Sequence, residues 1–222
     1  LVEVLLEVVI LSMNVQKSKS LGLISLFLLS LFLAMVTTAP TVSAVNETSS
    51  GTITGTETWT GVMNLDGDLL VAGGAKLIIN AGTTINIPAN KSIQIQGSIC
   101  AGDSSCGASQ ASTGSPIRFI WGTPASTAPN QTGICYVQGV FNPDLSCGSG
   151  IYLASTIDQS LTRMNHVTLD GAYGIPVDID GQGTIKYGAM IFDGASLTVT
   201  NTTFSNINTT NVLAFNGASP TL

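Results

Sequence analysis

The sequence predicts an all-β fold, a parallel β-helix (a solenoid) with coils of about 23–24 residues, preceded by a helical signal peptide. Apolar pairs recur every eight residues between positions 69 and 95, and a second segment, at 190–199, repeats at an offset of 23. An apolar stretch of 16 residues behind two lysines predicts the signal peptide. Short strands that repeat at a fixed interval after an export signal together indicate a secreted repeat protein.

The signal peptide is predicted over residues 13–44. Lys17 and Lys19 form a short positive region, an apolar stretch follows at 21–36, and small residues end the segment at Ala44. This order is typical of a secretory signal, so we expect cleavage after Ala44. The apolar stretch is shorter than the ~20 residues that a membrane-spanning helix needs. An uncleaved membrane anchor is the alternative interpretation.

The rest of the chain divides by composition and repeat. Residues 1–12 precede the first Met and are interpreted as a non-native upstream extension, and residues 45–56 as a polar leader. The β-helix is expected over residues 57–222, with a cap for its first coil at 58–63. Because the repeat stops in mid-coil at Leu222, we interpret the chain as the N-terminal fragment of a longer protein.

The apolar pairs predict the strands and their stacking. In each pair the two residues are separated by one position, so both face the same side of a strand. Gly, Pro and Asn residues, which favour turns, fill the gaps between the pairs. Three steps of eight residues carry the chain once around a three-sided coil, so Leu69 should stack beneath Ile93, and Val71 beneath Ile95. The pairs are Leu69 and Val71, Leu77 and Ile79, Ile85 and Ile87, and Ile93 and Ile95.

A second repeat gives nearly the same coil length. The segment FDGAS at Phe192 recurs as FNGAS at Phe215, and the match extends from Met190 with Leu213 to Val199 with Leu222. A period in the twenties built from short strands is typical of a solenoid. An antiparallel sandwich is the alternative, but the turns within 69–95 lack the Asn-Gly and Asp-Gly pairs that favour hairpins.

Several stretches resemble a known family: SPIRFIWGTP from Ser115, GIYL from Gly150, SLTRMNHVTLDGAYG from Ser160 and ASLTVTNTTFSN from Ala195. They are similar to successive coils of secreted right-handed β-helix proteins of the pectin-lyase-like superfamily, many of them large prokaryotic surface proteins. The resemblance covers roughly residues 55–222 and implies a right-handed helix. For enzymes of this kind it implies clustered Asp residues that bind calcium or act as acid and base, with Arg or Lys nearby. Core and turn residues carry the resemblance, so it points to architecture more than to activity.

Four cysteines fit an oxidising compartment. Of the three possible connectivities, sequential pairing of Cys100 with Cys106 and Cys135 with Cys147 is the simplest, because each pair closes a short loop rich in Gly and Ser. Metal ligation is the alternative interpretation. It is disfavoured because neither pair has the CxxC spacing and the single histidine, His166, has no partner nearby in the sequence.

Two acidic clusters are candidate ligand sites. Asp178 and Asp180 would share one face of an extended strand and are the candidates for a metal, which would be Ca²⁺. The surrounding residues do not match the calcium loop of an EF-hand, and a solvated turn is the favoured alternative. Asn64, Asp66 and Asp68 form a similar cluster around a glycine, with the same alternative.

His166 is a candidate general base because the ordinary pKa of histidine suits proton transfer near neutrality. We expect it to share a strand face with Met164 and Thr168, and an outward-facing structural role is favoured over catalysis. Arg118 and Arg163 are isolated in the sequence. The chain contains neither a Gly-x-Ser-x-Gly elbow nor a glycine-rich phosphate loop with Lys, so no catalytic residue and no cofactor are assigned.

Aromatic residues at expected loop or edge positions could stack on sugar rings. These are Trp59, Trp121, Tyr136, Phe141 and Tyr152. The favoured alternative is that Phe119 and Trp121, which alternate with Arg118 and Ile120, pack as core or cap. Residues 100–149 are expected to form a long loop excursion between coils, and long ordered loops often carry function.

Five Asn-x-Ser/Thr sequons could accept glycans in an exported protein. They lie at Asn46, Asn90, Asn130, Asn201 and Asn208. A structural role in turns or side-chain ladders is the alternative, notably for Asn201 and Asn206.

The charge pattern excludes several partners. The residues after Ala44 carry a net charge of −6 with no basic cluster, so neither nucleic acid nor an anionic membrane surface is expected to bind. Membrane contact is expected only through the signal segment or a C-terminal anchor. We predict a secreted or cell-surface protein with a structural, adhesive or ligand-displaying role and with carbohydrate or other cell-surface ligands as partners. The alternatives are the N-terminal part of a polysaccharide lyase or hydrolase with catalytic coils beyond residue 222, and a cell-envelope scaffold.

Overall fold

The computed structural model describes residues 46–123, 136–137, 140–141, 148–178, 185–209 and 211–222. The predicted signal peptide and upstream extension lie outside these residues, as do Asn130, Cys135, Cys147 and Asp180. The described residues form β-strands and one 3-10 turn, with no α-helix among them. Val, Ile, Thr and Phe dominate the strands, and Gly and Asn the turns, as their backbone preferences require.

Most strands lie in three columns of parallel strands, of which the first two belong to one continuous sheet. The first column consists of the first half of β3 (Val62–Val71), β5 (Thr84–Ile87), β8 (Ile117–Trp121), β13 (Val167–Asp170) and β17 (Thr203–Ser205). The second consists of the second half of β3, β6 (Ser92–Ile95), β11 (Gly150–Leu153), β15 (Ile185–Asp193) and β18 (Asn211–Asn216).

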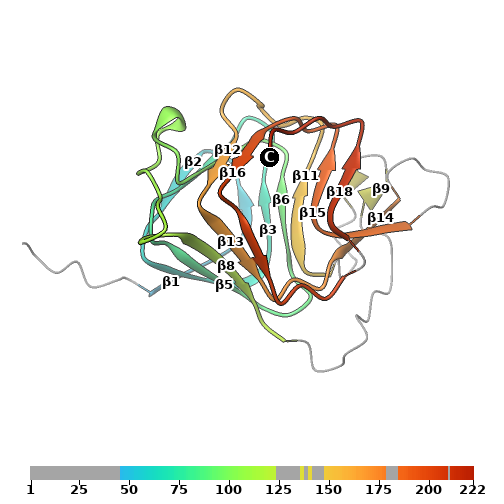
Figure 1. The fold of residues 1–222 in the computed structure, drawn as a ribbon, viewed down its shortest axis with the longest axis horizontal. Coiled ribbons are helices and arrows are strands. Elements are labelled where there is room, and N and C mark those ends of the chain that lie inside the picture. Colours follow the sequence, from blue (N-terminus) through green and yellow to red (C-terminus); the bar gives the residue numbers. More distant parts are fainter. Residues whose placement is uncertain (1–45, 124–135, 138–139, 142–147, 179–184, 210) are drawn as a thin grey trace, which may run out of the picture. The chain divides into compact units, whose positions relative to one another are not determined.

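The third column is a separate parallel sheet of five strands. It consists of β2 (Thr56–Trp59), β4 (Lys76–Ile79), β7 (Ser98–Ala101), β12 (Arg163–Asn165) and β16 (Thr198–Thr200). The chain visits the third, first and second columns in turn, and the strands curl together like a half-barrel (Figure 1).

Four further strands flank the columns. β1 (Asn46–Ile53) pairs in parallel with β3. β14 (Ile175–Asp178) pairs antiparallel with β15, and β9 (Tyr136–Val137) joins β14 and β10 (Val140–Phe141). The segment predicted as a polar leader therefore contributes a strand to the fold, because Ile53 at its end is buried in the core.

The register of the parallel pairs matches the predicted stacking. Leu69 pairs with Ile93, and Val71 with Ile95. The second repeat is also in register, with Met190 opposite Leu213. Residues 24 positions apart in the first case and 23 in the second thus lie on neighbouring strands, which are about 4.8 Å apart in a β-sheet.

The inward residues of all three columns form one apolar core. All eight members of the predicted apolar pairs are buried, with at most 2 % of their surface exposed. Burial of one such side chain stabilises the folded state by about 1.5–3 kcal/mol. The core continues through the later strands with Phe119, Ile151, Leu153, Met190 and Phe192.

The predicted loop excursion over residues 100–149 contains a core strand. β8 lies in its middle, and Ile117, Phe119 and Trp121 on this strand are buried. Alternation of apolar and other residues in IRFIW gives the strand one inward face, and β8 pairs with β5 and β13 on either side. The excursion is therefore divided into two connections, before and after β8.

The connections that lead into the first column share one backbone conformation. Each connection from a third-column strand to the next first-column strand contains a residue with φ between +50° and +83°. Glycine adopts this left-handed conformation freely, and Asn and His tolerate it better than most other residues. The five residues are Gly61, Gly82, Gly102, His166 and Asn201.

A charge at Ile85 should unfold the protein. Ile85 is fully buried on β5, so Ile85→Asp places an unpaired carboxylate in the core and should cost at least about 3 kcal/mol. Urea unfolding followed by circular dichroism measures this loss. Thr203→Asp, at an exposed position of β17 in the same column, should change stability by less than about 0.5 kcal/mol. Equal stability of the two variants would contradict the assignment of Ile85 to the core.

Candidate functional site

In the cluster of Asn64, Asp66 and Asp68, Asp68 makes contacts with the start of a neighbouring strand. Asp68 accepts hydrogen bonds from Ser92 through its backbone N (2.7 Å) and its Oγ (3.0 Å), and forms an ion pair with Lys91 (3.1 Å). Asp68 therefore ties β3 to the start of β6. This supports a structural role for the cluster.

The second acidic candidate is only partly described. Asp178 ends β14, its side chain lies outside the description, and Asp180 lies in the segment 179–184 that is not described. Within the described ranges no group of three or more His, Cys, Asp or Glu residues could hold a metal ion. The Ca²⁺ site stays a prediction.

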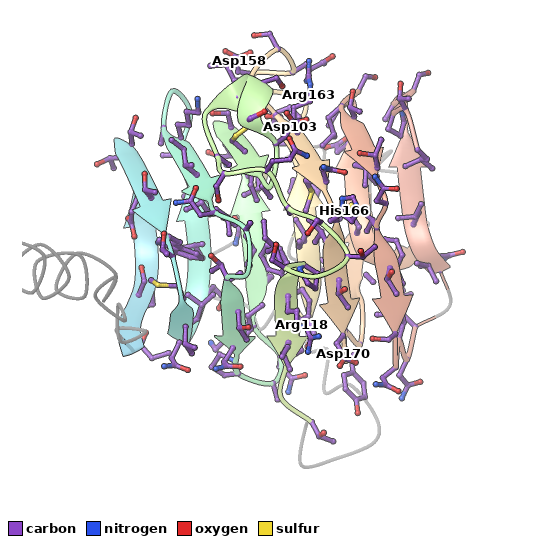
Figure 2. The ribbon with its side chains drawn as sticks, turned by 60° about the vertical axis from the view of Figure 1, so that its left-hand side comes forward. Asp103, Arg118, Asp158, Arg163, His166 and Asp170 are labelled. Carbon is purple, nitrogen blue, oxygen red and sulfur yellow. A yellow bond between two sulfur atoms is a disulfide. The ribbon has the colours of Figure 1, made fainter. Side chains whose placement is uncertain are left out.

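The charged residues around the disulfide are bound within their own turns (Figure 2). Asp103 accepts a hydrogen bond from the backbone N of Ser105 (2.8 Å). Hydrogen bonds from Ser160 hold the pKa of the exposed Asp158 carboxyl below its usual range. Arg163 donates through Nη1 to two backbone carbonyl groups of the turn that precedes it. These contacts shape turns.

The predicted disulfide between Cys100 and Cys106 is present, with Cα atoms 5.7 Å apart. It packs with Ile78 and Ala108 in a small apolar cluster separate from the main core. Lys76 on β4 donates to the carbonyl of Cys106 (2.7 Å). The disulfide thus fastens the 3-10 turn (Ser104–Cys106) to the third column.

The predicted placement of His166 within a strand is wrong. His166 lies between β12 and β13 with φ +50°, a left-handed conformation that turns the chain. Met164 before the turn is buried in the core, whereas Thr168 after it is only half-buried, so the two do not share a face with the histidine. The His166 Nδ1 atom lies 3.1 Å from Oδ1 of Asn165.

Asn165 connects three levels of this corner. Its Oδ1 accepts hydrogen bonds from Thr200 Oγ1 (3.0 Å) and Asn201 Nδ2 (2.9 Å). Its Nδ2 donates to the carbonyl of Gly102 one level below (3.3 Å). These bonds satisfy the buried Asn165 amide and join neighbouring levels at the corner that leads into the first column.

The described sequons differ in how their side chains are used. Asn46 lies on β1, and Asn90 is a half-buried residue with φ +59°. Asn201 is exposed, but its amide is engaged by Asn165. Asn208 is exposed. Glycosylation stays a prediction at all of these positions, and the geometry supports the structural alternative for Asn201.

Two of the candidate sugar-stacking aromatics are core residues, as the favoured alternative has it for Trp121. Trp59 and Trp121 have 1 % and 4 % of their surface exposed. Their Nε1 atoms donate to Glu57 Oε1 (2.5 Å) and to the carbonyl of Lys91 (2.8 Å). Trp121 stacks on Phe119 with ring centroids 6.3 Å apart, which confirms the core alternative. These side chains occupy inward positions of their strands, so they pack in the core and do not contact a ligand.

Tyr152, also predicted to face ligand, is buried on the outward side of the second column. It pairs with Gln94 on one side and Ile191 on the other. Its chain neighbours Ile151 and Leu153 belong to the core, and Tyr152 does not. The remaining aromatic candidates, Tyr136 and Phe141, lie in β9 and β10, where side chains are not described.

Tyr152 and Asp193 form a buried hydrogen-bonded pair. The Tyr152 hydroxyl donates to Asp193 Oδ2 at 2.5 Å. Burial, and then the hydrogen bond to Asp193, raise the pKa of Tyr152 far above its usual range. The phenol is therefore a permanent donor, and the carboxylate is held in place at a site shielded from water. Sequence reasoning missed Asp193, since 41 residues separate it from Tyr152.

Gln94, the register partner of Tyr152 on β6, also lies on this face. Sequence reasoning missed it as well. Its side chain is 1 % exposed, and within the described part of the chain neither Oε1 nor Nε2 has a hydrogen-bond partner. β14 lies close to the same face, because a Cβ added to Gly150 would be 3.2 Å from Ile175 Cγ1. The outward face of the second column at β6, β11 and β15 is thus a buried polar site, defined here as the Gln94–Tyr152–Asp193 site.

The outward face of the first column is open by comparison. Arg118 on β8 is exposed and Asp170 on β13 is half-buried. Arg118 pairs with Thr168, two residues before Asp170, so the guanidinium and the carboxylate are diagonal neighbours on one face (Figure 2). The register therefore places two charged residues that are 52 positions apart in the sequence on one face, where Asp170 Oδ1 accepts a hydrogen bond from Asn206 Nδ2 (2.7 Å).

Substitutions at Asn201 should separate its two roles. Asn201→Ala removes the bond to Asn165 and leaves a side chain in the left-handed region, so it should cost about 2 kcal/mol. Asn201→Gly removes only the bond and should cost about 1 kcal/mol less than Ala. Urea unfolding measures both values. Asn208→Ala, at the exposed sequon, is the control and should have almost no effect, and an equal loss for all three variants would contradict the corner network.

Alkaline pH should weaken the fold through Tyr152. Since the folded pKa is raised, Tyr152 ionises in the unfolded chain first, near its ordinary value of about 10. Stability should be fully present below pH ~10 and fall above it, by up to about 1.4 kcal/mol per pH unit from this group. Tyr152→Phe should flatten that decline in urea unfolding measured from neutral to alkaline pH. Tyr173→Phe, at a half-buried tyrosine, should leave the slope unchanged, and a wild-type slope in Tyr152→Phe would contradict the assignment.

No helix among the described residues is long and apolar enough to cross a membrane. No protein-family model, curated protein or solved structure matches the chain.

Proposed function

We propose that this chain folds as a right-handed parallel β-helix of the pectin-lyase-like kind and acts outside the cell as a structural, ligand-displaying surface protein. One observation carries the proposal: parallel neighbours in all three columns are offset by about one coil wherever no long connection intervenes. The offset is 24 residues for Leu69 with Ile93, 22 for Lys76 with Ser98 and 23 for Met190 with Leu213. Repeats that stack only on their neighbours are typical of solenoids.

Two features support export. The sequence before Ala44 has the order of a secretory signal. The Cys100–Cys106 disulfide suits an oxidising compartment, where such bonds persist. Cleavage after Ala44 would leave a chain whose first strand, β1, begins at Asn46.

The open face of the first column supports ligand display. Its outward positions carry hydroxyl, amide and charged groups: Thr84, Asn86, Arg118, Thr168, Asp170 and Thr203. Such a face offers hydrogen bonds over several coils to an extended carbohydrate or another surface ligand. The buried tryptophans and the locally bound acids favour this scaffold role over the carbohydrate-active alternative. A cell-envelope scaffold is a variant of the same proposal.

Export can be tested with the full 222-residue chain in a bacterial host. Intact mass and N-terminal sequencing of the exported fraction should show a chain that begins at Val45 with Cys100 and Cys106 oxidised. Leu28→Arg places a charge in the apolar stretch and should abolish processing, since signal peptides need this stretch. Arg118→Glu, an exposed change in the folded unit, is the control and should be exported normally. Retention of the wild-type chain in the cytoplasm, unprocessed, would overturn the proposal.

A further inference from the structure

The amide of Gln94 is the most conspicuous unexplained group among the described residues. It is 1 % exposed on β6, and neither of its two polar atoms has a partner within the described ranges. A buried polar group without a partner costs about 1–3 kcal/mol, so both atoms together would be a substantial liability. The position does not require a polar residue.

The register partners of Gln94 in the neighbouring strands show that this position accepts apolar residues. Leu70 precedes it in register and Tyr152 follows it, with Ile191 beyond. Leucine and isoleucine therefore fit the same outward position in adjacent coils without any hydrogen bond. A buried amide with two unsatisfied atoms calls for a partner, and a molecule bound at this point would supply one.

The chemistry of the site restricts what that molecule is. An amide needs a partner that accepts from Nε2 and donates to Oε1, and hydroxyl and carboxamide groups do both. Anions are disfavoured because the Asp193 carboxylate lies two strands away on the same face, buried and held by Tyr152. An ammonium ion would suit the Asp193 carboxylate. It can only donate hydrogen bonds, however, so it could not accept one from Gln94 Nε2.

We propose that the Gln94–Tyr152–Asp193 site binds a small neutral molecule through a hydroxyl or carboxamide group that pairs with the Gln94 amide. The Tyr152 ring would form one wall of the site, since it lies beside Gln94 in the adjacent strand. The proposal does not depend on export or surface display. Failure of the binding test would therefore leave the proposed function standing, and failure of the export test would leave the ligand proposal standing.

Thermal unfolding of the full chain, dialysed exhaustively, tests the proposal with glycerol, D-galactose and acetamide as neutral probes. Sodium acetate and ammonium chloride are the charged probes. Because such solutes also change the stability of any protein, the quantity measured is the difference in Tm shift between wild type and Gln94→Leu. At least one neutral probe should give a saturable difference of about 2–4 °C, and the charged probes none.

Two further measurements make the test specific. Gln96→Leu makes the same replacement at a half-buried glutamine two residues along the chain, and it should respond to the probes like wild type. In nuclear magnetic resonance spectra, the side-chain amide signal of Gln94, identified by its absence in Gln94→Leu, should move with the active neutral probe. This titration uses the wild-type chain, so it decides the question even if Gln94→Leu does not fold.

Three outcomes would overturn the proposal. The first is an equal response of wild type and Gln94→Leu to every probe, with an unmoved Gln94 amide signal. The second is a Gln94→Leu variant more stable than wild type with no probe effect, which would mean that the amide is idle or holds only a water molecule. The third is binding of acetate in preference to the neutral probes.

Discussion

In-register stacking of inward side chains is the constraint on which this structure depends. The hydrogen bonds of a parallel ladder fix the spacing of neighbouring strands at about 4.8 Å, so each inward residue packs on its register partner in the preceding strand of its column. Leu69 beneath Ile93 and Met190 beneath Leu213 are two such contacts. A slip of one residue would turn the core pair of a strand to the outside. Insertions are therefore confined to the connections between strands, as in the 50-residue step from Ile117 to Val167.

The same constraint leaves the outward positions free and gives the corners a fixed conformation. At the corner that leads into the first column the chain changes direction, and all five levels use a left-handed residue there. Where glycine is replaced there, side chains form bonds of their own: Asn201 binds Asn165, and His166 lies beside it. Polar residues at this corner are thus explained by backbone geometry and need no ligand.

The parts of the fold that could be predicted from sequence are those specified locally. The pairing of Leu69 with Ile93 follows from an eight-residue period, and the Cys100–Cys106 bond from a short separation. The core position of Phe119 and Trp121 on β8 follows from the alternation within IRFIW. The period does not identify this strand, because insertions on both sides of β8 interrupt it. The turn at His166 resembles a strand in sequence, and only its position above Gly102 reveals the left-handed corner.

The Gln94–Tyr152–Asp193 site was beyond sequence reasoning for a related reason. Ser92, Gln94 and Gln96 alternate with isoleucines, a pattern that indicates a solvated outer face. Their burial coincides with long connections, since the second column steps by 58 residues from Ile93 to Ile151 and by 39 from Ile151 to Met190. The first column also contains insertions, yet its outward face stays open at Arg118. Insertion alone therefore does not bury a face. In the second column β14 returns from its connection to pair with β15 and lies close to Gly150, and on this face Gln94, Tyr152 and Asp193 are buried.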